Sequence, residues 1–355
     1  MGGANMKTIL FTGGGSAGHV LPNVALIEEL LTTGDTDVVY MGTDGIEKTL
    51  VGERKIPFYQ IDCPKLIRGG GVRGLKRNLG IPMRLRQAIK QASSALQKIK
   101  PDLVFSKGGY VALPVVLAAS KAGIPCLSHE SDFSVGLANR LLAKKCVKVF
   151  TSFPETAKRI SHGAYSGAPI RREIFNANRT EARQRLGIHD HDVAVLIFGG
   201  GSGSQCINDA VRKHVKALTD RYFVLHVCGK GNLAQCNLER YKQFEFITDM
   251  GMAYAASDLI VSRAGAGAIF EILSLQKPAL FIPLEGQTRG DQLQNANYFH
   301  AKHLCKILRQ NQLDELPNAL DELSQDTQLQ TNLKESLFRS GNAVILQEIR
   351  RLLRL

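Results

Sequence analysis

The sequence has no tryptophan, few aromatic residues and no long apolar run. A helix that crosses a membrane needs roughly 18 to 20 apolar residues in succession, and Gly, Ser or Lys interrupts the longest apolar stretches of this chain. Any contact with a membrane is therefore expected to be peripheral. The first residues also lack the basic start and apolar core of a secretory signal, and Lys7 opens a predicted strand instead, so we expect no export.

Paired cysteines are missing as well. Seven cysteines are spread over the 355 residues, with no CxxC pair and no Cys/His spacing of the kind that binds zinc. An odd number of scattered cysteines predicts buried free thiols in a reducing compartment.

Acidic residues are absent from one long segment. The net charge is +13, and residues 64–100 contain ten Lys or Arg but no Asp or Glu. An anionic partner is therefore expected, whether nucleic acid, anionic lipid or a phosphate-bearing substrate. The same segment also has no aromatic residue to stack on a nucleic-acid base. We therefore expect no nucleic-acid partner.

Two distant parts of the chain begin in the same way. A predicted strand runs into three glycines and a serine at 13–16 and again at 199–202, and a helical pattern follows each time, at 21–31 and at 206–218. Strand and helix signals then alternate after each copy, which is typical of parallel sheets. The predicted fold class is α/β, with two Rossmann-like domains facing each other across a cleft.

Two breaks suggest where the domains end. Residues 163–169 lack any periodicity, and Ser340-Gly-Asn342 interrupts the last helical patterns. We therefore expect domains over 1–163 and 164–340, with a terminal helix over 341–355 that joins the first domain.

The first glycine loop carries the most direct chemical signal. Gly13-x-Gly15-x-x-Gly18 matches the fingerprint in which glycines let the backbone approach phosphates at a helix N-terminus. His19 follows the loop, and an imidazole is suited to accept a proton near neutral pH, so it is the candidate base. The alternative is a structural role, bonded to the loop backbone, but the position beside a phosphate-type loop favours the base. His129 and Glu130 follow a predicted strand, where parallel sheets bind ligands, or they form a structural ion pair.

The second half offers a similar opening before a helix. Small residues at 264–268 follow a predicted strand, and the helix N-terminus that they open favours a diphosphate. Glu271 comes about a turn and a half later, where it can accept hydrogen bonds from a ribose diol or can simply be solvated beside a tight helix–sheet contact. Residues 287–295 are rich in amides and carboxylates, which suits either sugar recognition or a polar surface loop.

Two other chemistries have weaker support. Asp35-Thr-Asp37 and Asp190-His-Asp192 match a minimal metal-binding pair, but both precede predicted strands and so fall in turns at the wrong edge of a sheet. We therefore predict no metal and no cofactor. Asp44 after a predicted strand leaves an NAD-dependent oxidoreductase as a remote alternative.

Taken together, these motifs resemble the MurG family of UDP-N-acetylglucosamine transferases. The resemblance spans nearly the whole chain and rests on Gly13–His19 with Pro22, Lys107–Val111 with Pro114, His129–Glu130 with Gly136–Asn139, Gly167–Arg171, and Ser262–Gly265 with Glu271. It implies the GT-B fold, with acceptor and membrane bound by the N-terminal domain and the UDP-sugar by the C-terminal one.

The implied reaction is an inverting, metal-independent transfer. N-acetylglucosamine moves to the C4 hydroxyl of the muramyl sugar of lipid I, which gives lipid II in peptidoglycan synthesis. A related GT-B transferase that acts on another lipid acceptor is the alternative.

The resemblance also implies roles for individual residues. His19, His129 and Glu130 would be catalytic, and the acceptor side would be lined by Ser16, Ala17, Gly18 and Asp132. The implied donor-binding residues are Arg171, Gly201, Ser202, Ile247, Ala266, Gly267, Ala268, Ile269, Phe270, Glu271 and Gln292. The sequence departs from the family where the usual His-Glu-Gln-Asn reads His129-Glu-Ser-Asp132.

Apolar and basic residues are interleaved on the implied membrane-binding face. The expected membrane residues are Leu75, Leu79, Ile81 and Met83. Apolar side chains inside a basic rim are suited to peripheral binding of anionic lipid. The implied location is the cytoplasmic face of the inner (plasma) membrane, and the implied partners are UDP-N-acetylglucosamine, undecaprenyl-linked lipid I and an anionic membrane surface.

Overall fold

The computed structural model describes residues 6–65, 78–201, 203–286, 290–336, 338 and 340–355. The chain divides into two compact units, one made of residues 1–171 and 340–355 and the other of residues 172–339. Each unit is built on a parallel sheet of its own, which confirms the α/β class and the two Rossmann-like folds. Within the described ranges, no helix is both long and apolar enough to span a bilayer.

The first unit has a seven-stranded sheet of order β3-β2-β1-β4-β5-β6-β7, and its neighbouring strands are parallel. The strands are β1 Lys7–Thr12, β2 Thr36–Gly42, β3 Phe58–Gln60, β4 Leu103–Ser106, β5 Cys126–Glu130, β6 Lys148–Thr151 and β7 Gly163–Tyr165. The helices are η1 Ala17–His19, α1 Leu21–Leu31, α2 Ile46–Gly52, α4 Ile81–Ile99, α5 Gly109–Lys121, α6 Leu137–Leu142, η2 Ala143–Lys145, α7 Pro154–Ala157 and α16 Asn342–Leu353.

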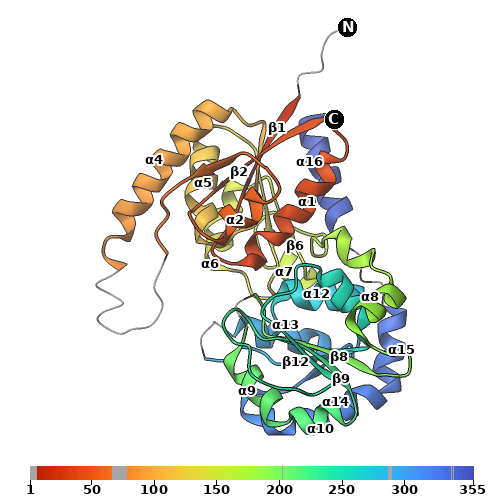
Figure 1. Cartoon of the computed structure of the whole chain (residues 1–355). Helices are drawn as coiled ribbons and strands as arrows, with labels where there is room; N and C mark the ends of the chain where they lie inside the picture. The colour runs from red at the N-terminus through yellow and green to blue at the C-terminus, as the bar shows by residue number, and fades with distance from the viewer. Residues whose placement is uncertain (1–5, 66–77, 202, 287–289, 337, 339) are drawn as a thin grey trace. The chain divides into compact units, whose positions relative to one another are not determined.

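Helices cover both faces of this sheet, so its strands are apolar on both sides. Phe11 belongs to a core with residues of α1 and α16, and the next residue along β1, Leu10, belongs to a core with residues of α4 and α5. Figure 1 shows α1 and α16 on one side of the sheet and α4 and α5 on the other. The carboxyl ends of the strands are left for the loops that carry the predicted chemistry.

The C-terminal helix α16 returns to the first unit. Its first residue, Asn342, accepts a hydrogen bond from the Ile170 amide (3.0 Å) and donates one to the Ile170 carbonyl (2.9 Å). Ile345 and Ile349 then enter the core shared with α1. The segment expected as a linker, 163–169, begins instead with β7, which is too short to show a period of two in the sequence.

The second unit has a six-stranded sheet of order β10-β9-β8-β11-β12-β13, again with parallel neighbours. The strands are β8 Ala194–Phe198, β9 Phe223–Val227, β10 Tyr241–Phe244, β11 Leu259–Ser262, β12 Ala279–Phe281 and β13 Lys306–Ile307. The helices are η3 Arg172–Phe175, α8 Arg179–Leu186, α9 Gln205–Lys213, α10 Val215–Thr219, α11 Met250–Ala256, α12 Ala266–Ser274, α13 Asp291–His300, η4 Gln310–Glu315, α14 Leu316–Gln325 and α15 Thr327–Glu335.

One predicted helix of this unit is wrong in its extent. The pattern at 206–218 predicts a single helix, but α9 and α10 meet at His214, whose backbone (φ −107°, ψ 11°) lies outside the helical region. No glycine or proline marks that break in the sequence.

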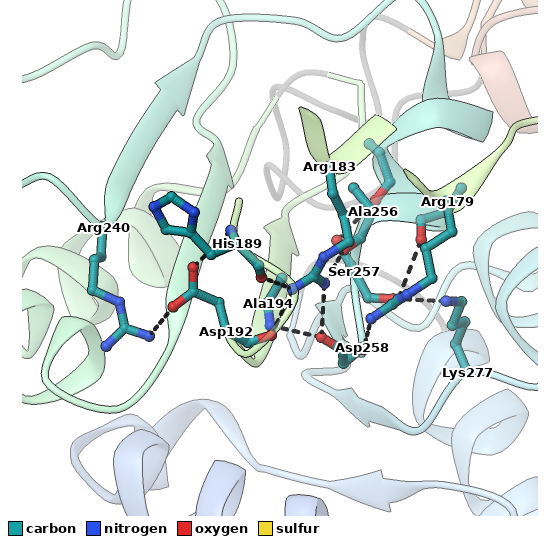
Figure 2. Close-up of polar contacts among 12 residues, drawn as sticks. Arg179, Arg183, His189, Asp192, Ala194, Arg240, Ala256, Ser257, Asp258 and Lys277 are labelled. Atoms are coloured by element: carbon teal, nitrogen blue, oxygen red, sulfur yellow. Dashed lines mark hydrogen bonds and ion pairs between the residues drawn. The ribbon is translucent and has the colours of Figure 1, made fainter. Parts of the chain in front are cut away.

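A partly buried ion network fixes α8 at the amino-terminal edge of the second sheet (Figure 2). The Arg183 side chain, 2% exposed, donates hydrogen bonds to the Ala256 carbonyl (3.0 Å) and to Asp258 (3.3 Å). Asp258 also accepts from Arg179 (2.6 Å) and from the amide of Ala194 (2.8 Å), the first residue of β8. The network lies at the edge opposite the carboxyl ends of the strands, so we assign it to stability.

Candidate active site

The first glycine loop turns sharply between β1 and η1. Gly13 and Gly15 have φ of +153° and +81°, a region that glycine adopts without strain. The Gly15 amide donates to the buried carboxylate of Glu47 (3.0 Å), and the other oxygen of that carboxylate accepts from the Thr43 amide (3.0 Å). An internal carboxylate therefore holds the loop in place.

His19 ends η1 directly after this loop and is partly exposed. Its Nδ1 lies 2.9 Å from the Ser16 hydroxyl oxygen. Loss of solvent around the ring lowers the pKa of His19 to about 4, assisted by the charge of Lys107 and opposed by that of Glu47. The imidazole is therefore unprotonated at neutral pH. If Ser16 accepts from Nδ1–H, Nε2 is the nitrogen that can take up a proton.

The rest of the predicted acceptor loop is more open. Ser16 and Gly18 are exposed, and Ala17 is partly exposed. No side-chain hydrogen bond caps η1 from Ser16, whose hydroxyl is instead in contact with His19. The loop thus presents small groups beside the imidazole.

His129 and Glu130, at the end of β5, have structural partners. His129 is fully buried, and its Nε2 donates to the Gly167 carbonyl (3.0 Å). Glu130 accepts from the amides of Gly136 (2.8 Å) and Asp132 (3.1 Å) and from the Asn139 side chain (3.0 Å). The alternative of an ion pair between the two is wrong. Both residues shape the turn after β5, and His129 has no exposed surface through which to act on a substrate.

The helix α12 opens at the carboxyl end of β11 in the second unit. Gly265 caps it without a side-chain hydrogen bond, and the first amides of a helix have no partner within the helix. Ala266, Gly267 and Ala268 are thus suited to a diphosphate. Ile269 is different, because its amide donates to the Gly265 carbonyl (3.1 Å) and its side chain is fully buried.

Phe270 is also directed into the core. Its ring packs edge-on against Phe299, with centroids 5.4 Å apart, and 4% of the residue is exposed. Neither side chain is available to a donor, so the predicted contact of Ile269 and Phe270 with the donor would have to be through the backbone. Their apolar side chains instead pack the helix that carries Glu271.

Three polar or backbone groups suit a nucleoside and a sugar. Glu271 is partly exposed on α12 and accepts a hydrogen bond from the Tyr254 hydroxyl (3.2 Å). Gln292, near the start of α13, accepts from the Leu284 amide (2.9 Å), which fixes the orientation of its carboxamide. The Ile247 side chain is buried shortly after β10, so its contact with a ligand would be through the backbone.

The second glycine loop follows β8. Gly203 has φ +76°, and a Cβ there would collide with the Cys228 carbonyl, so glycine is required. Gly201 is exposed and has no neighbour that a Cβ would meet, while Ser202 lies outside the described residues. The loop continues into Ser204, whose hydroxyl accepts from Arg263 (2.8 Å).

Comparison with known proteins gives the family. The N-terminal domain of glycosyltransferase family 28 matches residues 9–151, and the C-terminal domain of the same family matches residues 194–349. A protein of Clostridium botulinum (strain Alaska E43 / Type E3) is 42% identical to this chain over 312 residues, which are 86% of each chain. A protein of Clostridium tetani (strain Massachusetts / E88) is 39% identical over 345 residues, which are 94% of this chain and 95% of the relative. Both are named UDP-N-acetylglucosamine--N-acetylmuramyl-(pentapeptide) pyrophosphoryl-undecaprenol N-acetylglucosamine transferase.

A solved structure agrees with these sequence matches. The crystal structure of MurG from Acinetobacter baumannii has a TM-score of 0.74 at 27% identity, over 97% of this chain and 99% of that one. The chain belongs to the MurG family of glycosyltransferases. Its two parallel-sheet units are those of the GT-B fold expected for that family.

The implied MurG membrane face falls at the start of α4. Leu79 and Met83 are 76% and 78% exposed, and Ile81 is partly exposed. Leu75 lies outside the described residues. Within the described part of the chain, Leu79 and Met83 are the two most exposed large apolar residues.

Two charged residues of the MurG motifs, Lys107 and Arg263, follow central strands of the two sheets. The sequence analysis gives neither of them a role in binding or catalysis. Lys107, at the end of β4, is 2% exposed and donates to the Ser131 hydroxyl (2.7 Å). Arg263, after β11, donates to the carbonyls of Ile282 and Pro283 (both 3.1 Å), and so connects two strand ends. Only the order of strands in each sheet reveals these partners.

The structure also gives the surroundings of Arg171 and of two acidic residues from the weaker sequence patterns. Arg171, the last residue of the first unit, is 8% exposed. Asp44, which kept an oxidoreductase open, forms a surface ion pair with Lys48 (2.8 Å). Asp192 of the second acidic pair binds Arg240 (2.9 Å) within the network of Figure 2.

Proposed function

We propose that this chain transfers N-acetylglucosamine from UDP-N-acetylglucosamine to the C4 hydroxyl of the muramyl sugar of lipid I, and so makes lipid II for peptidoglycan synthesis. The observation that carries the proposal is the 42% and 39% identity, over most of their length, to relatives with that transferase name. The motif residues at the strand ends of the two sheets support it.

The second unit is proposed to bind the donor. The first amides of α12, at Ala266, Gly267 and Ala268, suit the diphosphate, and the partly exposed carboxylate of Glu271 suits the two ribose hydroxyls. The oriented carboxamide of Gln292 suits the sugar hydroxyls. These three chemistries match the parts of a UDP-sugar.

The first unit is proposed to supply the base. His19 accepts the proton of the acceptor hydroxyl as the oxygen of that hydroxyl forms a bond to the anomeric carbon of the donor. The bond between the anomeric carbon and UDP breaks at the same time, and its electron pair leaves with UDP. The acceptor attacks the face opposite UDP, so the configuration inverts. Charge growing on the departing diphosphate is stabilised by the α12 amides and by Arg171.

This account needs no metal ion in the transfer. Turnover should therefore persist in EDTA. Complete loss of transfer in EDTA, restored by magnesium or manganese, would contradict this part of the proposal.

The membrane role is proposed for the start of α4. Leu79 and Met83 enter the lipid interface while Arg84 and neighbouring basic residues meet anionic headgroups. We therefore propose that the enzyme binds peripherally at the cytoplasmic face of the plasma membrane, where it would meet its lipid-linked acceptor.

The proposal is tested with purified protein, lipid I in detergent micelles and labelled UDP-sugars. UDP-N-acetylglucosamine should give lipid II, and UDP-glucose should give little product. Transfer to another lipid acceptor without transfer to lipid I would favour the related transferase instead. Absence of any transfer from a UDP-sugar would reject the proposal.

A further inference from the structure

A buried ammonium group lies at the carboxyl end of β4, behind the proposed base. Lys107 is 2% exposed, and its Nζ donates to the neutral hydroxyl of Ser131 (2.7 Å). Burial of a lysine charge costs stability, and the negative charges of Glu130 and Asp132 offset only part of that cost, because burial still lowers the pKa of Lys107 to about 8. A residue kept at such a cost calls for a role in the site.

The turn that carries Lys107 packs directly under the glycine loop and the imidazole. The Lys107 amide donates to the Thr12 carbonyl (2.9 Å), and a Cβ on Gly13 would lie 3.1 Å from the Lys107 Cβ. A Cβ on Gly109, two residues further along, would lie 3.5 Å from ring atoms of His19. The lysine and the histidine therefore flank the same short turn.

The groups that face His19 come from several elements. Ser16 contacts its Nδ1, Glu47 of α2 supports the loop beside it, and Lys107 follows β4. Tyr110 of α5 packs its ring on Gly15 and is kept neutral, because burial raises its pKa.

Two of these neighbours are charged, and they act in opposite directions on the ring. The Glu47 carboxylate favours the protonated imidazolium, and the Lys107 ammonium disfavours it. Glu47 is committed to the loop through its hydrogen bond to Gly15. Loss of solvent is the larger effect that lowers the pKa of His19, and the Lys107 charge adds to it and opposes Glu47.

We propose that Lys107 is a positioning residue of the transfer reaction, whose buried ammonium, bonded to Ser131, acts together with the burial of the His19 ring to keep the imidazole unprotonated and ready to accept the acceptor proton. This inference rests on the proposed function, in which His19 is the base. Lys107 touches no reacting atom in this account and acts through charge alone. Charges at Glu130 and Asp132 hold it protonated in turn, against the burial that lowers its pKa to about 8.

The direct test is an NMR titration of the His19 ring, assigned by comparison with His19→Ala. In the wild type the ring should stay neutral down to pH 5. In Lys107→Met the pKa of His19 should rise by about one unit or more, and in Glu47→Gln it should fall. Solvent that enters around the ring after a loss of packing would also raise the pKa of His19, so the rise must also occur in a variant that keeps the packing of this side chain.

Further variants separate charge from packing. Lys107→Gln, which keeps a hydrogen-bond donor for Ser131 without the charge, should behave like Lys107→Met even if the latter folds poorly. Ser131→Ala, which keeps the charge and loses the anchor, should leave the pKa of His19 close to that of the wild type. A His19 titration that is the same in the wild type, Lys107→Met and Lys107→Gln would overturn the inference.

Turnover distinguishes this inference from the function on which it rests. The acid limb of the transfer rate should move to higher pH in Lys107→Gln. If His19→Ala transfers sugar as fast as the wild type, the proposed base is wrong whatever the titration gives. If His19→Ala is inactive but the limb does not move in Lys107→Gln, only the role of Lys107 is wrong.

Discussion

At the scale of single residues, Glu271 tests the proposed donor site. Glu271→Gln keeps the shape of the side chain but makes it a weaker acceptor for a ribose diol. A hydrogen bond to a charged group contributes about 1.5 to 3 kcal/mol, so the KM for UDP-N-acetylglucosamine should rise at least about tenfold, with a smaller effect on kcat. Tyr254→Phe, which removes the neighbouring 3.2 Å hydrogen bond but keeps the carboxylate, is the control. An unchanged KM in folded Glu271→Gln would remove Glu271 from the site.

Lys107 gives a second residue-scale prediction, on stability. Burial lowers the pKa of Lys107 from 10.5 to about 8. Between pH 8 and pH 10.5 the unfolded chain therefore binds more protons at this lysine than the folded chain does. The contribution of Lys107 to the free energy of unfolding thus rises with pH in this range. Below pH 8 the charge opposes folding by on the order of 3 kcal/mol. Lys107→Met should therefore be more stable than the wild type at pH 7, with a smaller gain at pH 10. Urea unfolding at both values measures the difference, and a less stable variant at pH 7 would contradict it.

The sequence predicts some of these residues better than others. His19 and the first glycine loop are adjacent in sequence, so a local motif finds them. Lys107 and Glu47 lie far from His19 along the chain and meet it only because β1 lies between β2 and β4 in the sheet. Strand order of this kind is not contained in a local pattern. The motif at His129–Glu130 is visible in sequence, but whether it faces a ligand or the core is not.

At the scale of elements, strands and helices with strong periodicity are predicted well. The helix expected at 21–31 is α1 with the same bounds. The break between α9 and α10 at His214 and the three-residue strand β7 leave no signal of their own, because tertiary contacts decide them. For apolar residues near a helix N-terminus, such as Ile269 and Phe270, the sequence does not distinguish a contact with a ligand from a place in the core.

The attachment of α8 gives a prediction at this scale. Asp258→Ala removes the carboxylate that binds Arg179, Arg183 and the first amide of β8, and leaves the buried Arg183 charge uncompensated. The free energy of unfolding should fall by about 3 kcal/mol. Asp44→Ala, which removes an exposed ion pair with Lys48, should leave the thermal midpoint nearly unchanged. Equal effects of the two substitutions would show that the network of Figure 2 does not fix α8.

At the scale of the whole molecule, the exposed apolar residues Leu79, just before α4, and Met83, in its first turn, should determine membrane binding. Leu79→Ser with Met83→Ser should weaken binding to anionic liposomes by about tenfold or more, because two apolar side chains no longer enter the interface. Leu233→Ser, at an exposed leucine of the second unit, is the matched control and should bind as the wild type does. Liposome co-sedimentation measures all three proteins, and unchanged binding of the double variant would exclude this face.

The duplicated architecture explains why two similar units have different tasks. Both place a glycine turn after a central strand. In the first unit a carboxylate and a lysine pack against the turn that precedes a histidine, and in the second the N-terminus of α12, after the next strand of the sheet, precedes a carboxylate on the same helix. The first arrangement is suited to proton transfer and the second to binding a nucleotide diphosphate. If one displacement uses the base of the first unit and the nucleotide site of the second, it must invert the configuration at the anomeric carbon of the sugar.

The anomeric configuration of the transferred sugar therefore tests the central claim most directly. Lipid II made by the purified protein from α-linked UDP-N-acetylglucosamine is analysed by proton NMR at the new glycosidic bond. The account predicts a β linkage to the C4 hydroxyl of the muramyl sugar. An α linkage would contradict the single displacement with His19 as its base.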